Sequence, residues 1–436
     1  MNSRVRDGTA SPASPVPVPR SPVPVFALAA GEDSGDLLGA DLIEALRVRF
    51  PDARFVGVGG SRMRAVGFES WHDIAELSVM GLAEVLRHLP RLLHLRRSLA
   101  RRFTELRPNV FIGIDAPDFN LGLEKKLKHA GIRTVHYVSP SIWAWRENRA
   151  DKIGQSADCV LCLFPMEPTI YAKHGVNARF VGHPLADRFP LAPDRDAARR
   201  ELGLSENAPV LAVLPGSRLS EIHRLGETFL EAARRVATEI PNLQVVIPAA
   251  NARCRSELDN LLRGSGLESG PETGDRGPEA DSSTLPGPRS PVPGPMLLDA
   301  HADRAMIAAN VVLLASGTAA LEAMLAKRPM VVGYRIAEFT HAVVKGLGML
   351  KTNVYSLPNI LAGKPLVPEL MQRDCTPARL ADAVVKLFGD SGHRAELIHE
   401  FERMHLALHA GGGAAAAAAL AIGQMLPTPE SGASSP

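Results

Sequence analysis

Short apolar runs alternate with longer amphipathic segments along most of the chain. Such runs, rich in valine, isoleucine and leucine, are typical of strands that are buried on both faces. The first half contains the candidate strands Val25–Ala30, Arg54–Val58, Val110–Ile114, Arg133–Val138, Cys159–Phe164 and Arg179–Val181. Helical patterns separate them, for example over Leu37–Phe50 and Leu121–Ala130. The alternation predicts an α/β fold with a parallel, doubly wound sheet.

The alternation stops between residues 182 and 209, which are rich in proline and contain no candidate strand. A second series follows, with the candidate strands Val210–Leu214, Gln244–Ile247, Met296–Leu298, Val311–Ala315 and Met330–Val332. We therefore expect two Rossmann-like domains that are joined near residue 190 and face a central cleft. Because ligands of such sheets bind beyond the carboxyl ends of the strands, a shared ligand would lie in that cleft.

Three segments lack a periodic apolar face, and we expect them to be disordered. The leader, residues 1–24, alternates proline with serine and valine. Between Gly264 and Pro295, seven glycines and seven prolines fall within 32 residues, which indicates a surface insertion. The third segment is the tail, residues 426–436, which follows an alanine-rich stretch that could extend a helix.

Composition narrows the class of protein further. The formal net charge of +2 gives no support for binding to nucleic acid. Cys159 and Cys162 lie in an apolar run, and no second ligand pair is spaced to complete a zinc site, so we expect core cysteines and no metal. No stretch of 18 or more apolar residues occurs, which favours a soluble, intracellular protein.

The stretch G-E-D-S-G-D, residues 31–36, follows the first candidate strand and opens a helix. It lacks the G-x-G-x-x-G pattern, and three acids there would repel a pyrophosphate, so it is not a dinucleotide fingerprint. The stretch G-V-G-G-S-R, residues 57–62, also departs from that pattern, at Arg62. Asp33 or Ser34 is expected to cap the helix. Whether Glu32 faces the cleft stays open.

The stretch G-I-D-A-P-D-F-N, residues 113–120, presents two carboxylates at the end of another candidate strand. Such a pair can form a catalytic edge, a helix cap or an ordinary turn. Asp118 and Asn120 could orient Asp115 or cap the following helix, and for Asp118 we expect capping.

Two stretches in the second half could bind an anion. In L-P-G-S-R, residues 214–218, Arg218 could meet a phosphate bidentately beside Ser217, although a surface turn would look much the same. In A-S-G-T-A-A-L-E-A, residues 315–323, a helix starts just after a very apolar strand. Its start offers free N–H groups and hydroxyls at Ser316, Gly317 and Thr318. Glu322 could bond ribose hydroxyls or only stabilise the helix start.

The segment 79–107 combines seven arginines with leucines at helical spacing. Pro90 is expected to split it into two helices. A basic amphipathic segment suits an anionic membrane surface, and the alternative is a core-packed helix with a solvated charged face. The candidate membrane contacts are Leu89, Leu92, Leu93, Arg96 and Arg97. Further along, Trp143 and Trp145 either pack in the core or line the cleft.

Taken together, these stretches resemble the lipid-A-disaccharide synthase family, whose members are glycosyltransferases of the GT-B type. The similarity extends from about Phe26 to Leu406. It rests on seven stretches in order: G-E-D-S-G-D-L-L-G-A, V-M-G-L-A-E-V-L, G-I-D-A-P-D-F-N, H-Y-V-S-P-S-I-W-A-W-R, L-P-G-S-R, L-L-A-S-G-T-A-A-L-E-A-M-L-A and S-L-P-N-I-L-A-G. The family usually has a short loop where residues 264–295 stand, and it lacks the proline-rich leader.

The resemblance implies a reaction and roles for four residues. UDP-2,3-diacylglucosamine donates its sugar to 2,3-diacylglucosamine 1-phosphate, which gives the β-1,6-linked disaccharide 1-phosphate and UDP without a cofactor. Residues important for activity are implied at Glu32, Asp115, Arg218 and Asn359, with Asp115 the suspected base. Since an α-linked donor gives a β product, the reaction inverts and needs a single general base.

The resemblance also implies an organisation and a location. Residues 25–190 would form the acceptor and lipid domain and residues 191–390 the UDP-binding domain. Helices within residues 391–425 would pack back on the first domain, and a C-terminal-swapped homodimer is known for the family. The protein would lie on the cytoplasmic face of the inner membrane. Rival interpretations are another UDP-sugar enzyme, such as an epimerase or a transferase for peptidoglycan precursors, and a non-catalytic protein that binds nucleotide sugars.

Overall fold

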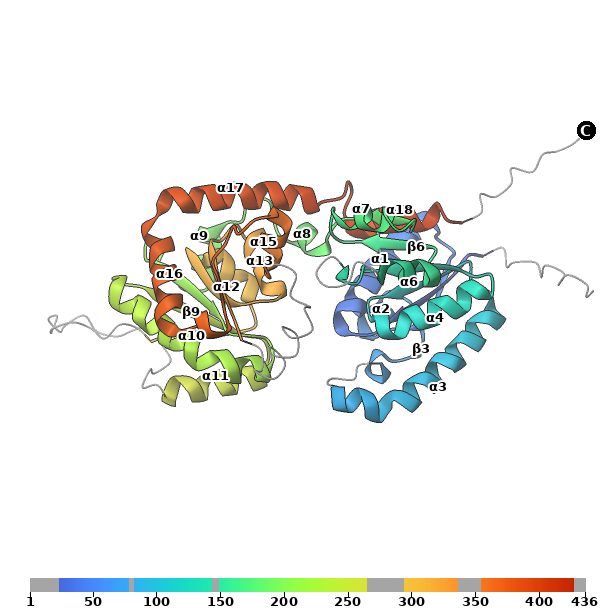
Figure 1. Cartoon of the computed structure of the whole chain (residues 1–436), viewed down its shortest axis with the longest axis horizontal. Helices are drawn as coiled ribbons and strands as arrows, with labels where there is room; N and C mark the ends of the chain where they lie inside the picture. The colour runs from blue at the N-terminus through green and yellow to red at the C-terminus, as the bar shows by residue number, and fades with distance from the viewer. Residues whose placement is uncertain (1–22, 78–81, 143–148, 265–293, 336–353, 427–436) are drawn as a thin grey trace, which may run out of the picture. The chain divides into compact units, whose positions relative to one another are not determined.

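The computed structural model describes residues 23–77, 82–142, 149–264, 294–335 and 354–426 (Figure 1). Within helix α3 the side chains are described from residue 89 onward. The expected leader, insertion and tail fall almost entirely outside the described residues. Trp143 and Trp145 also lie outside them.

The first half of the chain forms a seven-stranded sheet in the order β3-β2-β1-β4-β5-β6-β7. Its strands are β1 (Val25–Ala30), β2 (Arg54–Val58), β3 (Glu69–His72), β4 (Val110–Ile114), β5 (Arg133–Tyr137), β6 (Cys159–Cys162) and β7 (Ala178–Phe180). Strand β1 pairs in parallel with both β2 and β4. The chain therefore winds outward from β1 in one direction, then returns and continues in the other direction, as in a Rossmann fold.

The second half repeats this topology in a six-stranded sheet with the order β10-β9-β8-β11-β12-β13. Its strands are β8 (Val210–Leu214), β9 (Gln244–Ala249), β10 (Met296–Asp299), β11 (Val311–Ala315), β12 (Met330–Tyr334) and β13 (Glu369–Met371). Strand β8 occupies the place that β1 has in the first sheet, between β9 and β11. The predicted pair of doubly wound, parallel sheets is confirmed.

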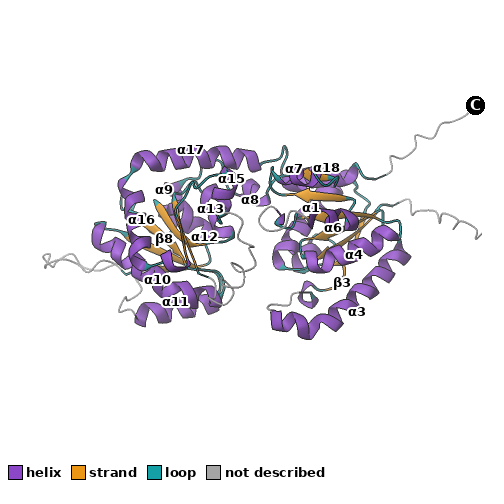
Figure 2. Ribbon diagram, in the orientation of Figure 1, coloured by secondary structure: helices purple, strands orange, loops and turns teal. Residues whose placement is uncertain are grey.

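Helices pack against the strands in both halves (Figure 2). The helices of the first half are α1 (Asp33–Arg49), α2 (Ser61–Ala65), η1 (Ile74–Glu76), α3 (Leu82–Leu106), α4 (Pro117–His129), α6 (Arg149–Ser156) and α7 (Glu167–Ala172). Two helices of the connecting segment, α8 (Pro184–Arg188) and α9 (Arg195–Glu201), pack against helices of the second half. Those of the second half are α10 (Leu219–Glu239), α11 (Ala252–Gly264), α12 (Ala302–Ala308), α13 (Thr318–Leu325), α15 (Leu357–Ala362), η2 (Gln372–Asp374), α16 (Pro377–Gly389), α17 (Ser391–Leu408) and α18 (Ala414–Gly423).

Sequence periodicity located the central strands best. The predicted bounds of β1, β2, β4, β8 and β11 agree with the structure. Two edge strands, β3 and β13, were not predicted, since each is short and begins with a glutamate. An edge strand has one free side, so it needs no continuous apolar run.

The expected break of the basic segment at Pro90 was wrong. Helix α3 runs from Leu82 to Leu106 with Pro90 inside it. Proline removes one backbone donor, but Pro90 is exposed, so water can satisfy the carbonyl that loses its partner.

Compact packing divides the chain into two units. One contains residues 1–138, 152–160 and 419–436, and the other contains residues 139–151 and 161–418. The division passes through β6, although β6 and β7 extend the first sheet. Helix α17 packs against α13, α15 and α16 of the second unit, whereas the chain from Ala419 onward belongs to the first. The domain boundary near residue 190 stays a prediction.

In each sheet, an asparagine side chain forms a hydrogen bond between the two central strands at their amino ends. Asn109 precedes β4, and its Oδ1 accepts a hydrogen bond from Val25 N of β1 at 2.9 Å. Asn310 precedes β11, and its Oδ1 accepts from Val210 N of β8 at 2.8 Å. In both cases the asparagine N–H also donates to the carbonyl of the same strand residue, at 2.8 Å. The two halves thus share this asparagine hydrogen bond as well as their topology.

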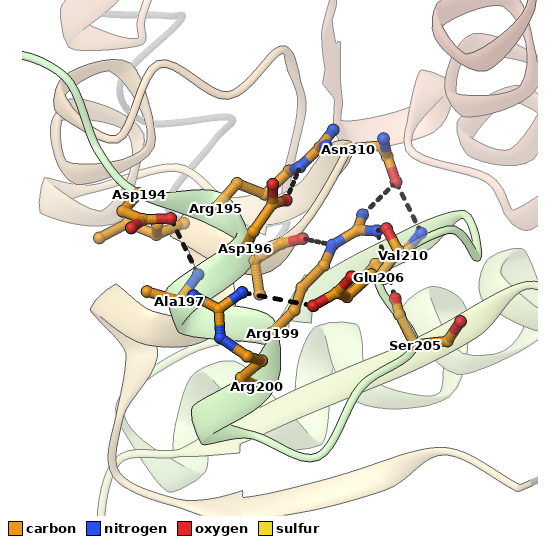
Figure 3. Close-up of polar contacts among 12 residues, drawn as sticks. Asp194, Arg195, Asp196, Ala197, Arg199, Arg200, Ser205, Glu206, Val210 and Asn310 are labelled. Carbon is orange, nitrogen blue, oxygen red and sulfur yellow. Dashed lines mark hydrogen bonds and ion pairs between the residues drawn. The ribbon is translucent and has the colours of Figure 1, made fainter.

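In the second half, Asn310 belongs to a larger buried cluster around Arg199 (Figure 3). Arg199 is only 1% exposed. Its Nη2 donates to Asn310 Oδ1 at 2.8 Å, and its Nε donates to the carbonyl of Ala308 at 2.9 Å. Its Nη1 donates to the carbonyls of residues 205, 206 and 208, at 3.3, 2.5 and 3.1 Å. One guanidinium therefore connects the loop before β8 to the end of α12 and the start of β11.

The same figure shows a D-x-D sequence, Asp194 and Asp196, at the start of α9. Asp194 Oδ1 accepts from Ala197 N at 2.8 Å and caps the helix. Asp196 Oδ1 accepts from Arg195 Nε at 3.1 Å. In the structure, Asp194 stabilises the helix start, and Asp196 pairs with its neighbour Arg195.

We predict that Arg199→Ala lowers the free energy of unfolding by roughly 3 kcal/mol or more, because it removes five hydrogen bonds, one of them to the buried carbonyl of Ala308. Urea denaturation followed by circular dichroism measures this loss. The neighbouring Arg200 pairs with Glu206 at 3.3 Å and is exposed, so Arg200→Ala serves as the control and should cost less than about 0.5 kcal/mol. Equal losses in the two variants would contradict the role given to Arg199.

Candidate functional site

Each sheet has one place where the direction of winding changes, and ligands of doubly wound folds bind there, beyond the carboxyl ends of the strands. In the first sheet this place lies between β1 and β4, and in the second between β8 and β11. Glu32 follows β1 by two residues and Asp115 directly follows β4. Ser217 and Arg218 follow β8, and Ser316, Gly317 and Thr318 follow β11. The candidate residues of each half therefore flank that half's switch point.

At the first switch point, Asp115 lies in an unusual backbone turn. Both Asp115 and Ala116 adopt the left-handed conformation, with φ of 52° and 43°. That region costs energy for residues other than glycine, and strained residues of this kind concentrate at functional sites. The Asp115 N–H still donates to the carbonyl of Tyr137 at the end of β5, at 2.8 Å. The turn thus presents Asp115 immediately after the last ladder bond of its strand.

The neighbouring chain segments fit closely around this turn. A Cβ on Gly31, at the end of β1, would lie 2.5 Å from the Cβ of Ala116, so only glycine fits there. After β5, Val138 also has a positive φ, of 79°, which is rare for a β-branched residue. The backbone is therefore constrained at three adjacent strand ends, those of β1, β4 and β5.

Asn120 connects two of these strand ends. It is fully buried on α4, and its Nδ2 lies within hydrogen-bond distance of the carbonyls of Ala29, Ile114 and Asp115, at 3.0, 3.2 and 2.8 Å. Of the two roles left open by the sequence, Asn120 therefore contacts the backbone of Asp115. The expected cap at Asp118 was wrong: the N-cap of α4 is Ala116, Pro117 is its first residue, and Asp118 lies exposed in its first turn.

A buried acid and imidazole lie one helical turn below Asn120. Glu124 Oε1 and His136 Nδ1 are 2.7 Å apart, and both side chains are 0% exposed. Burial raises the pKa of Glu124, while the adjacent His136 partly opposes that shift. The carboxylate occupies the space beside Gly113, where a Cβ would lie 2.1 Å from Glu124 Oε1. Gly113 is thus the strand residue that makes room for this pair.

Glu32 is exposed and forms the N-cap of α1, and its side chain makes no capping bond. Neither Asp33 nor Ser34 caps this helix, so that expectation was wrong. A buried acid of this helix, Asp36, was not among the predicted site residues, and it is 2% exposed. Its carboxylate accepts from the N–H groups of Gly60, Arg62 and Met63, at 2.7, 2.9 and 3.2 Å. Because Asp36 occupies the start of α2, that helix end is closed to an external phosphate.

At the second switch point, Arg218 is the N-cap of α10 and is exposed, as is Ser217. Glu221 Oε2 accepts from the backbone N–H of Ser217 at 2.9 Å. Glu221 Oε1 lies 3.8 Å from Arg218 Nη1. Glu221 holds the turn, and the guanidinium of Arg218 stays largely exposed to solvent, where it can meet an anion.

The start of α13 offers the second anion site of this edge. Gly317 is its N-cap, with a φ of 158°, and both Gly317 and Thr318 are exposed. Because the N-cap is a glycine, no N-cap side chain occupies the helix start, and its first N–H groups have no intrahelical partner. Glu322 is half-buried one turn further on, and burial together with Asp303 raises its pKa.

Asn359 is built into the fold more tightly than the sequence indicated. It is 1% exposed, and its Oδ1 accepts from the N–H groups of Leu366 and Val367 at 2.7 and 2.8 Å. Its Nδ2 donates to the carbonyl of Val367 at 3.0 Å and to Glu369 Oε1 at 2.7 Å. Since each polar atom already has partners, this side chain holds the segment around residues 359–369.

The candidate membrane contacts on α3 include exposed side chains and side chains that are partly buried within the protein. Leu89 is 42% exposed, Arg97 is exposed, and Leu92 and Leu93 are half-buried. Arg96 is half-buried and turns toward α4, because a Cβ on Gly122 would lie 2.3 Å from Arg96 Nη1. Helix α3 therefore packs on α4 through one face and leaves part of the basic face exposed.

Comparison with known proteins identifies the family. The family model described as "Lipid-A-disaccharide synthetase" matches residues 26–267 and 294–418. A lipid-A-disaccharide synthase from Xanthomonas campestris pv. campestris (strain 8004) is 55% identical over 432 residues, which cover 98% of this chain and 92% of the relative. One from Xylella fastidiosa (strain M12) is 54% identical over 398 residues, which cover 91% of this chain and 97% of the relative.

Solved structures show the fold. The glycotransferase of kitacinnamycin has a TM-score of 0.56 at 17% identity, and covers 93% of this chain and 100% of its own. The calicheamicin glycosyltransferase CalG4 has a TM-score of 0.53 at 17% identity, and covers 93% of this chain and 98% of its own. These neighbours share the GT-B type of two Rossmann-like sheets. With the family match over most of its length and relatives more than half identical, the chain belongs to the lipid-A-disaccharide synthase family.

Proposed function

We propose that this chain joins UDP-2,3-diacylglucosamine to 2,3-diacylglucosamine 1-phosphate and releases UDP, with Asp115 as the general base. The family assignment supports the reaction. The observation that carries the role of Asp115 is its position: it follows the central strand of the first sheet in a constrained turn, at the switch point where ligands bind.

In the proposed step, the Asp115 carboxylate accepts the proton of the acceptor's 6-hydroxyl while that oxygen attacks the anomeric carbon of the donor. The bond from the anomeric carbon to the UDP oxygen breaks, and its electron pair leaves with UDP. A single displacement of this kind inverts the configuration and needs one base. We assign Glu32, exposed at the adjacent end of β1, to the same catalytic edge.

The residues proposed to bind UDP belong to the second sheet. Negative charge that develops on the leaving diphosphate needs fixed positive partners. The exposed Arg218 guanidinium and the open start of α13 at Ser316, Gly317 and Thr318 would supply them. Ser217 lies beside Arg218, and Glu322 would accept hydrogen bonds from the ribose hydroxyls. Asn359 would act indirectly, by holding the segment around residues 359–369 in place.

We further propose that the protein lies on the cytoplasmic face of the inner membrane, with α3 as the contact. In the part of the chain that the structure describes, no helix has the length and apolar character needed to cross a bilayer. Exposed Leu89 beside exposed arginines is the combination that suits an anionic lipid surface. The C-terminal-swapped homodimer is a further proposal, and it rests on the family resemblance.

We predict that Asp115→Asn lowers the rate of disaccharide formation by at least about a hundredfold, since the amide cannot accept the proton. Purified protein is incubated with both substrates, and the disaccharide is quantified by mass spectrometry. UDP affinity, measured by calorimetry, should stay within about twofold. Asp118→Asn is the matched control, an exposed aspartate three residues away, and should keep near-normal turnover. Near-normal turnover of Asp115→Asn would contradict the assigned base.

We also predict that Arg97→Glu weakens binding to anionic vesicles by roughly 5- to 30-fold, because each basic side chain near such a surface contributes about 1 kcal/mol and the new carboxylate adds a repulsion of up to similar size. Co-sedimentation with phosphatidylglycerol vesicles measures it. Arg97 is preferred to Arg96, which packs on α4. Arg253→Glu, an exposed arginine on α11, is the charge-matched control and should bind normally. Equal binding by the two variants would favour a packed helix with a solvated charged face.

A further inference from the structure

The three carbonyls that Asn120 contacts belong to both central strands of the first sheet. Ala29 lies near the end of β1, Ile114 ends β4, and Asp115 begins the left-handed turn. A carboxamide has two N–H groups, so these acceptors take up its whole donor capacity. One buried side chain thus joins β1, β4 and the turn at their carboxyl ends.

This arrangement includes two features that are unfavourable in free energy. Asn120 Oδ1 is buried, and among the described residues it has no hydrogen-bond partner. The turn that Asn120 supports contains two consecutive left-handed residues, Asp115 and Ala116. Unsatisfied buried atoms and strained backbone are both unfavourable, and natural proteins retain them mainly at functional sites.

The opposite end of the same two strands shows what a purely structural asparagine looks like. Asn109 joins β1 and β4 at their amino ends through its bond with Val25, and the backbone around it continues the regular ladder. The registry of the strands is thus already fixed at that end and along the ladder. Asn120 adds a constraint at the one place where Asp115 leaves the strand.

We propose that Asn120 is a positioning residue for Asp115, an inference that rests on the proposed role of Asp115 as base. Its amide holds the peptide between Asp115 and Ala116 in the left-handed turn and so aims the carboxylate at the acceptor. Without it, the carbonyls of Ala29, Ile114 and Asp115 lose their contacts with the amide, and the turn relaxes toward an unstrained conformation. The fold and the UDP site of the second sheet remain.

The test compares Asn120→Ala with Asn109→Ala, which removes the asparagine at the other end of the same strand pair. Asn120→Ala should lower kcat by about 10- to 100-fold, because small displacements of a catalytic group have effects of that size. KM for both substrates should change less than threefold, and the UDP affinity should be unchanged. Asn109→Ala should lose about as much thermal stability as Asn120→Ala, but its kcat should stay within about threefold of that of the unaltered protein.

A double-mutant cycle separates the failure of this inference from the failure of the proposed base. In the Asp115→Asn background, adding Asn120→Ala should lower the residual rate by less than about threefold, since both changes act on one group. An equal loss in the two backgrounds would overturn the positioning role. A normal rate for Asp115→Asn alone would instead overturn the proposed base.

A milder variant keeps the inference testable if Asn120→Ala does not fold. Asn120→Ser retains one hydrogen-bond donor. Its kcat should lie between that of the unaltered protein and that expected for Asn120→Ala. If Asn120→Ser loses stability as Asn109→Ala does and yet keeps normal kcat, Asn120 is only structural.

Discussion

The central constraint in this molecule is that β1 and β4 must end together, beside a turn that is unfavourable on its own. The two strands lie side by side, and the chain winds away from them in opposite directions, so no crossover helix covers the edge between them. That leaves an open edge for chemistry, but the backbone there needs other support. Gly31 provides room for Ala116, and Asn120 supplies donors to the carbonyls of both strands.

The second sheet has the same open edge and supports it differently. At β8 and β11 the turns are stabilised by Glu221, which accepts from the backbone N–H of Ser217, and by the glycine N-cap of α13. The exposed groups at this edge are N–H donors and a guanidinium, whereas the edge of the first sheet exposes carboxylates. One topology thus produces an edge suited to a base and an edge suited to a diphosphate. At the opposite ends of the strands from these edges, Asn109, Asn310 and Arg199 fix the amino ends of the sheets.

The sequence predicted what depends on local pattern. Five central strands have the predicted bounds because buried parallel strands are continuous apolar runs, and the residues directly after them were therefore placed at the correct edges. It missed what depends on distant partners. Asp36 binds backbone groups 24 to 27 residues away, and Asn120 reaches Ala29, 91 residues earlier. The resemblance implied that Asn359 is important for activity, but the bonds of its side-chain amide to Leu366 and Glu369 join residues that no local pattern relates.

The proposed role of Asp115 requires the acceptor sugar to lie next to its carboxylate. The most direct measurement is a crystal structure of the protein with UDP and 2,3-diacylglucosamine 1-phosphate bound together. We expect a carboxylate oxygen of Asp115 within about 3.2 Å of the acceptor's 6-hydroxyl, the distance needed for proton transfer. A 6-hydroxyl that instead contacts Glu32 or another group, with Asp115 out of reach, would contradict the assignment.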